Sequence, residues 1–245
     1  MSRWAKGSLY ILTPVVALSL AAWGVNVVMR AMTHSGIFEL QEIRLLGLER
    51  LNEGRLRERL RPSSGETLFD LDLASLQGTL LTEPWIKEVN LRREYPNALS
   101  VQVLERHPVA VLAGRQVEAI VDETGAVIEA WPNGGEIPGQ WSSLPVIHGI
   151  EAASLKNRDA GAVKSFASAR EILRAAPETV GQGLDLDVGR LEDPRVQRHG
   201  YWLRFGSAPF ERKWERFLSV EGEIERRREG VQEVDLRFPD QVIVR

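Results

Sequence analysis

One apolar segment near the start of the chain constrains everything that follows it. From Tyr10 to Met29 the sequence YILTPVVALSLAAWGVNVVM contains no charged residue. Its length of about 20 residues is enough for a helix to cross a hydrocarbon core of about 30 Å. Arg3 and Lys6 precede it, and cytoplasmic flanks of membrane helices are rich in such residues. We therefore expect residues 1–9 to be a short cytoplasmic tail, residues 10–30 to be a transmembrane helix, and the remainder to be exported.

A cleaved signal peptide is the alternative for the same segment. Ser19 and Ala21 are small residues at the spacing of a cleavage site. The apolar run continues past them through Val25, Val27 and Met29, beyond the point where the apolar region of a signal peptide ends. The sequence therefore favours a retained anchor. Release of the exported part from carbonate-washed membranes would contradict this prediction.

The composition narrows the classes of function. The chain of 245 residues is 43% hydrophobic and 27% charged, which is ordinary for folded globular domains. Its formal net charge of -3 provides no overall positive field for a polyanion, so nucleic-acid binding is disfavoured. The sequence contains no cysteine, which excludes a disulfide framework, a thiolate metal site and a cysteine nucleophile.

Short amphipathic elements follow one another over residues 36–106. A strand is predicted across GIFELQEIRLLGLERL, where apolar and charged side chains largely alternate before Gly47 interrupts the pattern. Two short helices are predicted next, with Asn52 and Asp72 as their N-caps. Each cap is flanked by leucines at the spacing of a hydrophobic staple, which fixes the direction in which the chain enters the helix.

A β-hairpin is predicted to complete this region. In EPWIKEVNLRREYPNALSVQVLERHP, residues 83–108, apolar residues alternate with polar ones on both sides of the turn at Tyr95-Pro96-Asn97. The order is then strand, helix, helix, strand, strand. Such a unit can place two helices on one face of a three-stranded sheet.

The segment GETLFDLDLASLQGTLLTEPWIKEVNLRREYPNALSVQVLERHPVAVL resembles the polypeptide-transport-associated (POTRA) domain of the FtsQ/DivIB family of bacterial division proteins. The resemblance lies in Pro84, Trp85, Ile86, Val89, Arg92, Arg93, Tyr95, Pro96, Leu99, Val103, Glu105, Pro108, Val109 and Ala110. It implies an α+β fold with a single N-terminal transmembrane helix. Two domains would follow this helix. The first is a β-α-α-β-β POTRA domain over residues 36–106, and the second is an FtsQ-type β-domain over residues 107–245, a mixed β-sheet with two helices.

Weaker patterns continue the resemblance through residues 107–245. Strands are predicted over Val109–Leu112, Glu118–Val121, Ala126–Ala130, Gly183–Val188 and Tyr201–Phe205, with one last strand over Val231–Val244. Helices are predicted over Ala162–Ala176 and from Phe210 to Arg228. The stretch WPNGGEIPGQWSSLPVIHG is rich in proline and glycine and is predicted to be a connection.

The sequence contains no recognisable active-site or cofactor motif. Hydrolase and phosphate-loop signatures are absent, the four histidines are isolated, and the Asp70 region lacks the glycine and glutamate of a calcium loop. We therefore expect no enzymatic activity, no metal and no cofactor. An exported, membrane-anchored cell-wall hydrolase is the alternative, because paired carboxylates need not be near in sequence. An outer-membrane assembly or secretion factor would need a barrel, for which about 140 residues leave no room.

The resemblance also implies a place and a role. It implies a non-enzymatic, bitopic scaffold of the bacterial division complex in the cell inner membrane, single-pass type II and enriched at the septum. Its N-terminus would be cytoplasmic and its two domains periplasmic. The scaffold would link early and late division proteins and control septal peptidoglycan synthesis. The implied partners are FtsB and FtsL at the C-terminal edge strand and other division proteins at the POTRA domain. A homodimer is also compatible with the resemblance.

The closing segment is the predicted contact region. A C-terminal strand is a natural sheet edge, and such an edge can accept a strand from a partner. Carried over by position, the resemblance assigns the FtsB contact to Arg237, Phe238, Val242 and Val244, with Arg198 as a weaker candidate. Arg237 is expected to point outward, whereas Leu236 and Phe238 are either contact or core residues. In the hairpin, Lys87, Arg92 and Arg93 are the candidates for recognition by the POTRA domain.

Overall fold

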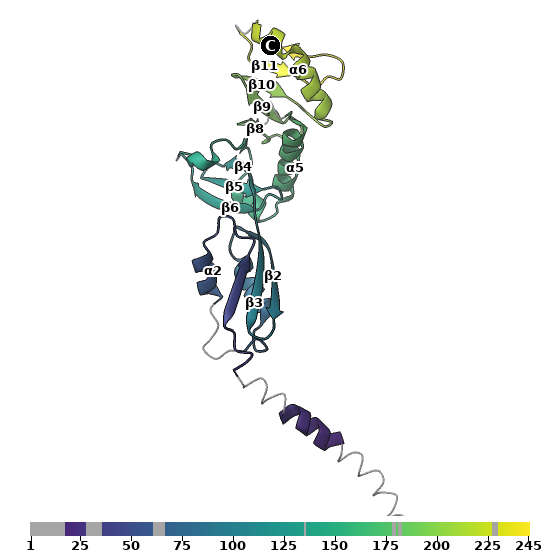
Figure 1. The fold of residues 1–245 in the computed structure, drawn as a ribbon. Helices are drawn as coiled ribbons and strands as arrows, with labels where there is room; N and C mark the ends of the chain where they lie inside the picture. Colours follow the sequence, from purple (N-terminus) through teal and green to yellow (C-terminus); the bar gives the residue numbers. More distant parts are fainter. Residues whose placement is uncertain are drawn as a thin grey trace, which may run out of the picture. The chain divides into compact units, whose positions relative to one another are not determined.

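The chain divides into two compact units, Met1–Glu105 and Arg106–Arg245, whose elements are drawn in Figure 1. The structure is a computed structural model. It describes residues 18–27, 36–60, 67–134, 136–177, 180, 183–226 and 230–245.

Residues 18–27 form a helix inside the segment for which the sequence predicts an anchor. The rest of that predicted helix of residues 10–30, and the whole predicted tail of residues 1–9, lie outside the described residues. Among the residues that are described, no helix combines the length and the apolar character needed to cross a membrane.

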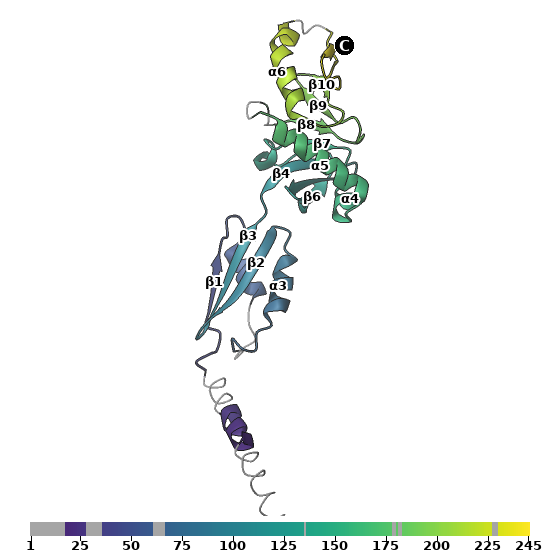
Figure 2. The ribbon, with the colours of Figure 1, turned by 90° about the vertical axis from the view of Figure 1, so that its right-hand side faces the viewer.

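The first unit contains a three-stranded sheet with two helices on one face (Figure 2). Its elements are β1 (Glu42–Leu46), α2 (Glu53–Arg59), α3 (Leu73–Leu81), β2 (Ile86–Glu94) and β3 (Ala98–Glu105). The strand order is β1-β3-β2, with β1 parallel to β3 and β2 antiparallel to β3. The predicted β-α-α-β-β order and the predicted hairpin are therefore confirmed.

Both predicted helix caps form. The Asn52 side chain accepts a hydrogen bond from the Arg55 N–H at 3.2 Å, and the Asp72 carboxylate accepts from the N–H groups of Ala74 and Ser75 at 3.0 and 3.2 Å. These bonds satisfy amide groups that a helix leaves unpaired in its first turn. Leucines of both helices pack on the sheet face formed by Ile43, Leu45, Val89, Leu99, Val101 and Val103.

A buried carboxylate connects the end of β3 to the loop after β1. Glu105 is buried, and its side chain accepts hydrogen bonds from the backbone N–H groups of Glu49, Arg50 and Leu51 at 2.9 to 3.2 Å. Gly47 allows the same loop to approach β3, because a Cβ there would lie 2.2 Å from the Val103 carbonyl oxygen. The conformation of this loop therefore depends on Gly47 and on the Glu105 carboxylate, which its backbone N–H groups bind.

The second unit is built on one nine-stranded mixed sheet. Its elements are β4 (Pro108–Ala113), β5 (Val117–Asp122), β6 (Val127–Pro132), the 3-10 helix η1 (Gly139–Trp141), β7 (Val146–His148), α4 (Ala152–Lys156), α5 (Ala160–Ala175), β8 (Asp185–Asp187), β9 (Arg195–Arg198), β10 (Tyr201–Arg204), α6 (Glu211–Arg226), β11 (Glu233–Asp235) and β12 (Ile243–Val244). The strand order is β12-β11-β10-β9-β8-β7-β4-β5-β6. The pairs β4–β7, β7–β8 and β10–β11 are parallel.

Helices α5 and α6 pack on the same face of this sheet (Figure 1). The sheet contributes Leu186, Val196, Leu203 and Val234 to the core, and the helices contribute Phe166, Ala169, Ile172, Trp214, Phe217 and Ile224. The Trp214 indole N–H donates to the Ile172 carbonyl at 3.1 Å, which ties α6 to α5. The apolar residues at helical spacing in α5 include Phe166, Ala169 and Ile172, which are buried, and Val163, which is 45% exposed.

Three sequence predictions for the second unit are wrong or incomplete. The stretch predicted as a connection ends in β7, and β9 and the short α4 were not predicted at all. The single closing strand over Val231–Val244 is instead two short antiparallel strands, β11 and β12. Pro239 lies between them and has no N–H to continue a ladder. The carbonyls of Leu236 and Phe238 accept hydrogen bonds from Arg216 of α6 instead.

Candidate partner-binding edge

Strand β12 is the outermost strand at one end of the sheet. Arg245 donates its N–H to the Glu233 carbonyl at 2.9 Å, and Glu233 donates to the Arg245 carbonyl at 3.1 Å. In an antiparallel pair the neighbouring residue directs its backbone groups to the opposite side. Val244, which lies opposite Val234, therefore directs its N–H and C=O away from β11. No described strand covers that side, so the edge can accept one.

An apolar groove lies beside this edge strand. It is lined by Val220, Glu223 and Ile224 of α6 and by Val231, Val242 and Val244, and it has a volume of about 300 Å³. Val244 is 44% exposed. Two of the predicted contact residues, Val242 and Val244, therefore lie together, and α6 supplies the opposite wall, which the sequence did not indicate.

Leu236 and Phe238 differ in burial, which resolves the choice between core and surface. Leu236 is buried in the core of the second unit, whereas Phe238 is exposed. Of these two residues, only Phe238 is available to a partner.

Arg237 lies at the surface, but its guanidinium is bound within the chain. Its Nη2 is 2.7 Å from Oδ2 of Asp235, and its Nε and backbone N–H donate to Oδ1 at 2.9 and 3.1 Å. These hydrogen bonds from Arg237, with the charge of Arg204, hold the pKa of Asp235 below its usual value although burial acts in the opposite direction. Gly206 leaves room for the arginine stem, since a Cβ there would lie 2.8 Å from its Cγ.

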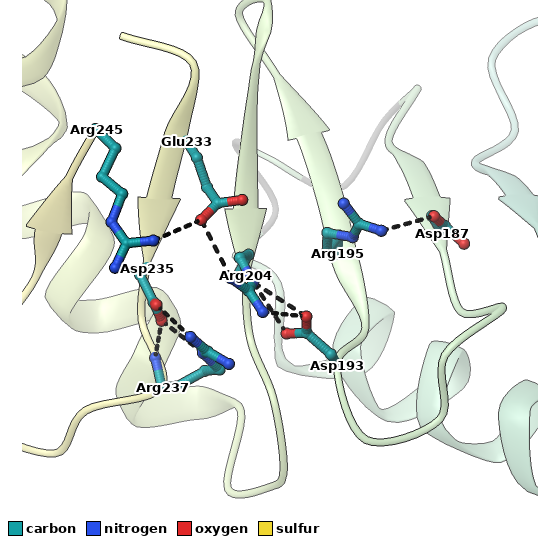
Figure 3. Close-up of polar contacts among 8 residues, drawn as sticks. All are labelled: Asp187, Asp193, Arg195, Arg204, Glu233, Asp235, Arg237 and Arg245. Atoms are coloured by element: carbon teal, nitrogen blue, oxygen red, sulfur yellow. Dashed lines mark hydrogen bonds and ion pairs between the residues drawn. The ribbon is translucent and has the colours of Figure 1, made fainter.

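Charged side chains of alternating sign cross the sheet beside this edge (Figure 3). Arg204 bonds Asp193, with Nε 3.0 Å from Oδ2, and also lies 3.3 Å from Glu233. The other ion pairs drawn are Arg195–Asp187 at 3.6 Å, Arg245–Glu233 at 3.9 Å and Arg237–Asp235 at 2.7 Å. The eight side chains are four guanidinium groups and four carboxylates, so this surface is polar but balanced in charge.

Arg198 is also engaged within the second unit. Its Nε donates to Oε1 of Glu221 on α6 at 2.6 Å, and the arginine side chain is only 18% exposed. His199 lies beside the same helix, with Nε2 3.5 Å from Glu221 and 3.3 Å from Glu225. The sequence prediction of Arg198 as a contact did not include these partners.

His199, Glu221 and Glu225 form a cluster that the isolated positions of the histidines in sequence did not predict. One ligand atom from each lies within 4.8 Å of the others. Oxygen and imidazole ligands suit several divalent metals. However, the Arg198 guanidinium bonds the same Glu221 oxygen, and its positive charge opposes a cation there. The signal for this cluster was the four-residue spacing of the two glutamates on a predicted helix.

The three hairpin candidates lie in different environments. Arg93 donates to the carbonyl oxygens of Leu68 and Leu71 at 2.6 and 2.7 Å, so its guanidinium connects β2 to the start of α3. Arg92 and Lys87 are exposed, and Lys87 lies at the irregularity in the β2–β3 pairing. Arg93 therefore has an internal role, and recognition by Lys87 and Arg92 stays a prediction.

Comparison with known proteins agrees with both units. Residues 38–106 match the family model described as POTRA domain, FtsQ-type. A cell division protein FtsQ of Allochromatium vinosum is 30% identical over 186 residues, which cover 75% of this chain and 68% of the relative. The FtsQ of Myxococcus fulvus is 28% identical, covering 89% and 76%, and that of Geotalea daltonii is 24% identical, covering 94% and 83%. On this similarity, which extends from the first unit into the second, the chain belongs to the FtsQ family of bacterial cell division proteins.

Proposed function

We propose that this protein is a non-enzymatic scaffold of the bacterial division complex. Residues 10–30 anchor it in the cell inner membrane, residues 1–9 lie in the cytoplasm, and the domains of residues 36–106 and 107–245 lie in the periplasm, with the protein enriched at the septum. There it links early and late division proteins and controls septal peptidoglycan synthesis. Family membership supports the role in division. The uncharged segment ending at Met29 supports the anchor.

The proposed partner at the edge strand is FtsB, paired with FtsL. The observation that carries this proposal is the combination of an uncovered edge and an adjacent apolar groove. Backbone groups of Val244 point away from β11, and Val242 and Val244 line the groove with Ile224. A partner that adds a strand gains main-chain hydrogen bonds, and its apolar side chains gain burial in the groove. Phe238 adds exposed apolar surface nearby on the chain.

The first unit is proposed to recruit other division proteins. Lys87 and Arg92 are the exposed cations of its hairpin, and Arg92 lies on the sheet face opposite the helices. Arg93 contributes indirectly, because it holds the chain before α3 against β2.

A proline substitution in the full chain tests the edge proposal. Val244→Pro removes the outward N–H, and an edge strand tolerates proline where that N–H faces solvent. Val244→Ala is the matched control, because it shortens the side chain but keeps the donor. With FtsB and FtsL of the same organism, the proline variant is expected to bind about tenfold more weakly, the loss that corresponds to one good hydrogen bond. The alanine variant is expected to lose less. Equal binding by both variants would remove the edge hydrogen bond from the interface.

Two observations test the location. Carbonate extraction is expected to leave the full chain in the membrane, and a fluorescent fusion is expected to concentrate at the septum of dividing cells. Release by carbonate would contradict the anchor, and a uniform envelope signal would contradict the role in division.

A further inference from the structure

Three aromatic rings from separate segments meet at one end of the first unit. Phe38 and Phe69 have ring centroids 5.1 Å apart, and Tyr95 lies 5.7 Å from Phe69 and 6.4 Å from Phe38. The cluster is not a core, because Tyr95 is 61% exposed and Phe69 is 46% exposed. Ile37, adjacent in sequence, is 58% exposed. We refer to Ile37, Phe38, Phe69 and Tyr95 as the aromatic cap.

The backbone holds these segments together without a partner. The Leu68 N–H donates to the Phe38 carbonyl at 2.8 Å, and Glu39 pairs with Thr67 in an isolated bridge. Asn97, just after Tyr95, donates from its side chain to Gln41 at 2.9 Å and accepts the Gln41 N–H at its carbonyl at 2.9 Å. Because the segments are fixed, docking of the cap costs little conformational entropy.

The cap begins eight residues after the uncharged segment, just before the first strand of the three-stranded sheet. Seven residues separate Met29 from Ile37. A chain of that length reaches at most roughly 30 Å even when extended. An anchor that ends near Met29 therefore keeps Ile37 within roughly 30 Å of the end of the anchor, so the cap can reach the bilayer surface. Aromatic rings favour the headgroup region of a membrane, where an apolar body and a polar edge are both accommodated.

We propose that the aromatic cap rests in the headgroup region of the phospholipid bilayer and holds the first unit against the outer surface of the membrane that anchors it. This rests on the proposed anchor of residues 10–30. Tyr95 suits such a site because its ring is apolar and its hydroxyl remains hydrated. The cap would then limit the directions in which the hairpin presents Lys87 and Arg92 to other proteins.

Site-directed spin labelling of the full chain tests this proposal, since the sequence contains no cysteine and every introduced thiol is unique. Tyr95→Cys and Phe69→Cys place a nitroxide in the cap. Leu104→Cys is the matched control, because Leu104 is 46% exposed like Phe69 but lies near the other end of β3. Strand geometry places it roughly 20 Å or more from the turn. Leu20→Cys reports on the anchor separately.

In phosphatidylcholine nanodiscs, the ratio of collision with oxygen to collision with a water-soluble nickel complex is measured. The ratio at positions 69 and 95 is expected to exceed that at 104 by about threefold or more, as for side chains buried in the interface. Thermal unfolding of each labelled variant checks that its fold is intact.

Equal ratios at positions 69, 95 and 104 would overturn the proposal, and a lipid-exposed label at position 20 would show that the anchor itself stands. An aqueous label at position 20 would overturn the anchor and the cap together. Shielding of position 95 from both reagents would also overturn the proposal, because it would mean that a protein covers the cap.

Discussion

Asp235 and Arg237 form an ion pair in which the carboxylate is fully buried and the guanidinium is 37% exposed, with Oδ2 and Nη2 2.7 Å apart. The pair therefore joins the core of the second unit to the surface on which partner binding is proposed. Arg237, which the family resemblance assigns to the partner contact, thus also binds a residue of its own chain. The effect of an Arg237 substitution on binding must therefore be separated from its effect on folding.

Loss of the arginine is expected to destabilise the second unit. Arg237→Ala leaves the buried Asp235 carboxylate without its main partner. A fully buried pair broken this way costs several kcal/mol, but the exposure of Arg237 reduces the expected loss to about 1–2 kcal/mol. Urea unfolding of the detergent-solubilised full chain measures this. Adding Asp235→Asn removes the unpaired buried charge and should recover part of the lost free energy of unfolding. An Arg237→Ala variant as stable as the original chain would contradict this interpretation of the pair.

Phe238 offers a cleaner test of the surface than Arg237 does. Phe238→Ala is expected to weaken FtsB binding by roughly 1–2 kcal/mol, as for a contact aromatic residue, and to lower stability less than a core substitution does, because Phe238 is 38% exposed. Leu191→Ala is the control, since Leu191 is similarly exposed in the same unit. Arg237→Glu combined with Phe238→Ala should abolish co-purification. Retained co-purification of a folded double variant would remove the closing segment from the interface.

The buried carboxylate of the first unit predicts a local effect. The Glu105 carboxylate accepts hydrogen bonds from the N–H groups of residues 49–51, and a glutamine is a weaker acceptor. Glu105→Gln is therefore expected to lower the free energy of unfolding by about 2–3 kcal/mol. Hydrogen exchange at those three amides should become faster. Glu88→Gln, an exposed change on the same hairpin, is the control. Unchanged exchange in Glu105→Gln would show that the carboxylate does not hold the loop.

Acid sensitivity is expected in the second unit. Burial of Asp122 opposes its ionisation, but hydrogen bonds from Thr124, Arg106 and the Ala126 N–H outweigh this and lower its pKa. A lowered folded pKa means that the stabilisation is complete above the unfolded value of about 3.9 and is lost as the pH falls through the folded pKa.

Asp122→Asn should therefore be less stable at pH 7 and should show a shallower loss of stability below about pH 4. Urea midpoints measured from pH 7 to pH 3 follow this difference. Parallel pH dependence in the two proteins would show that Asp122 does not contribute to it. The Asp235 carboxylate, whose pKa is also lowered, contributes to the pH dependence that remains in the variant.

The long, strongly patterned elements could be predicted from the sequence alone. The caps at Asn52 and Asp72, the hairpin, and helices α5 and α6 each depend on residues a few positions apart. Local hydrogen bonds and one apolar stripe are enough to specify such elements. The same patterns, with the motif around Pro84 to Ala110, are also enough to indicate the family.

Only the tertiary structure decided the short strands and the partners of the charged residues. Strands β7 and β9 have three and four residues, too few for alternation to be recognised, and they form because neighbouring strands complete their hydrogen bonds. The sequence alone determined that arginines occupy positions 93, 198 and 237. Whether each guanidinium meets solvent, a carbonyl or a carboxylate depends on segments far away in sequence, and so does the meeting of three rings in the aromatic cap.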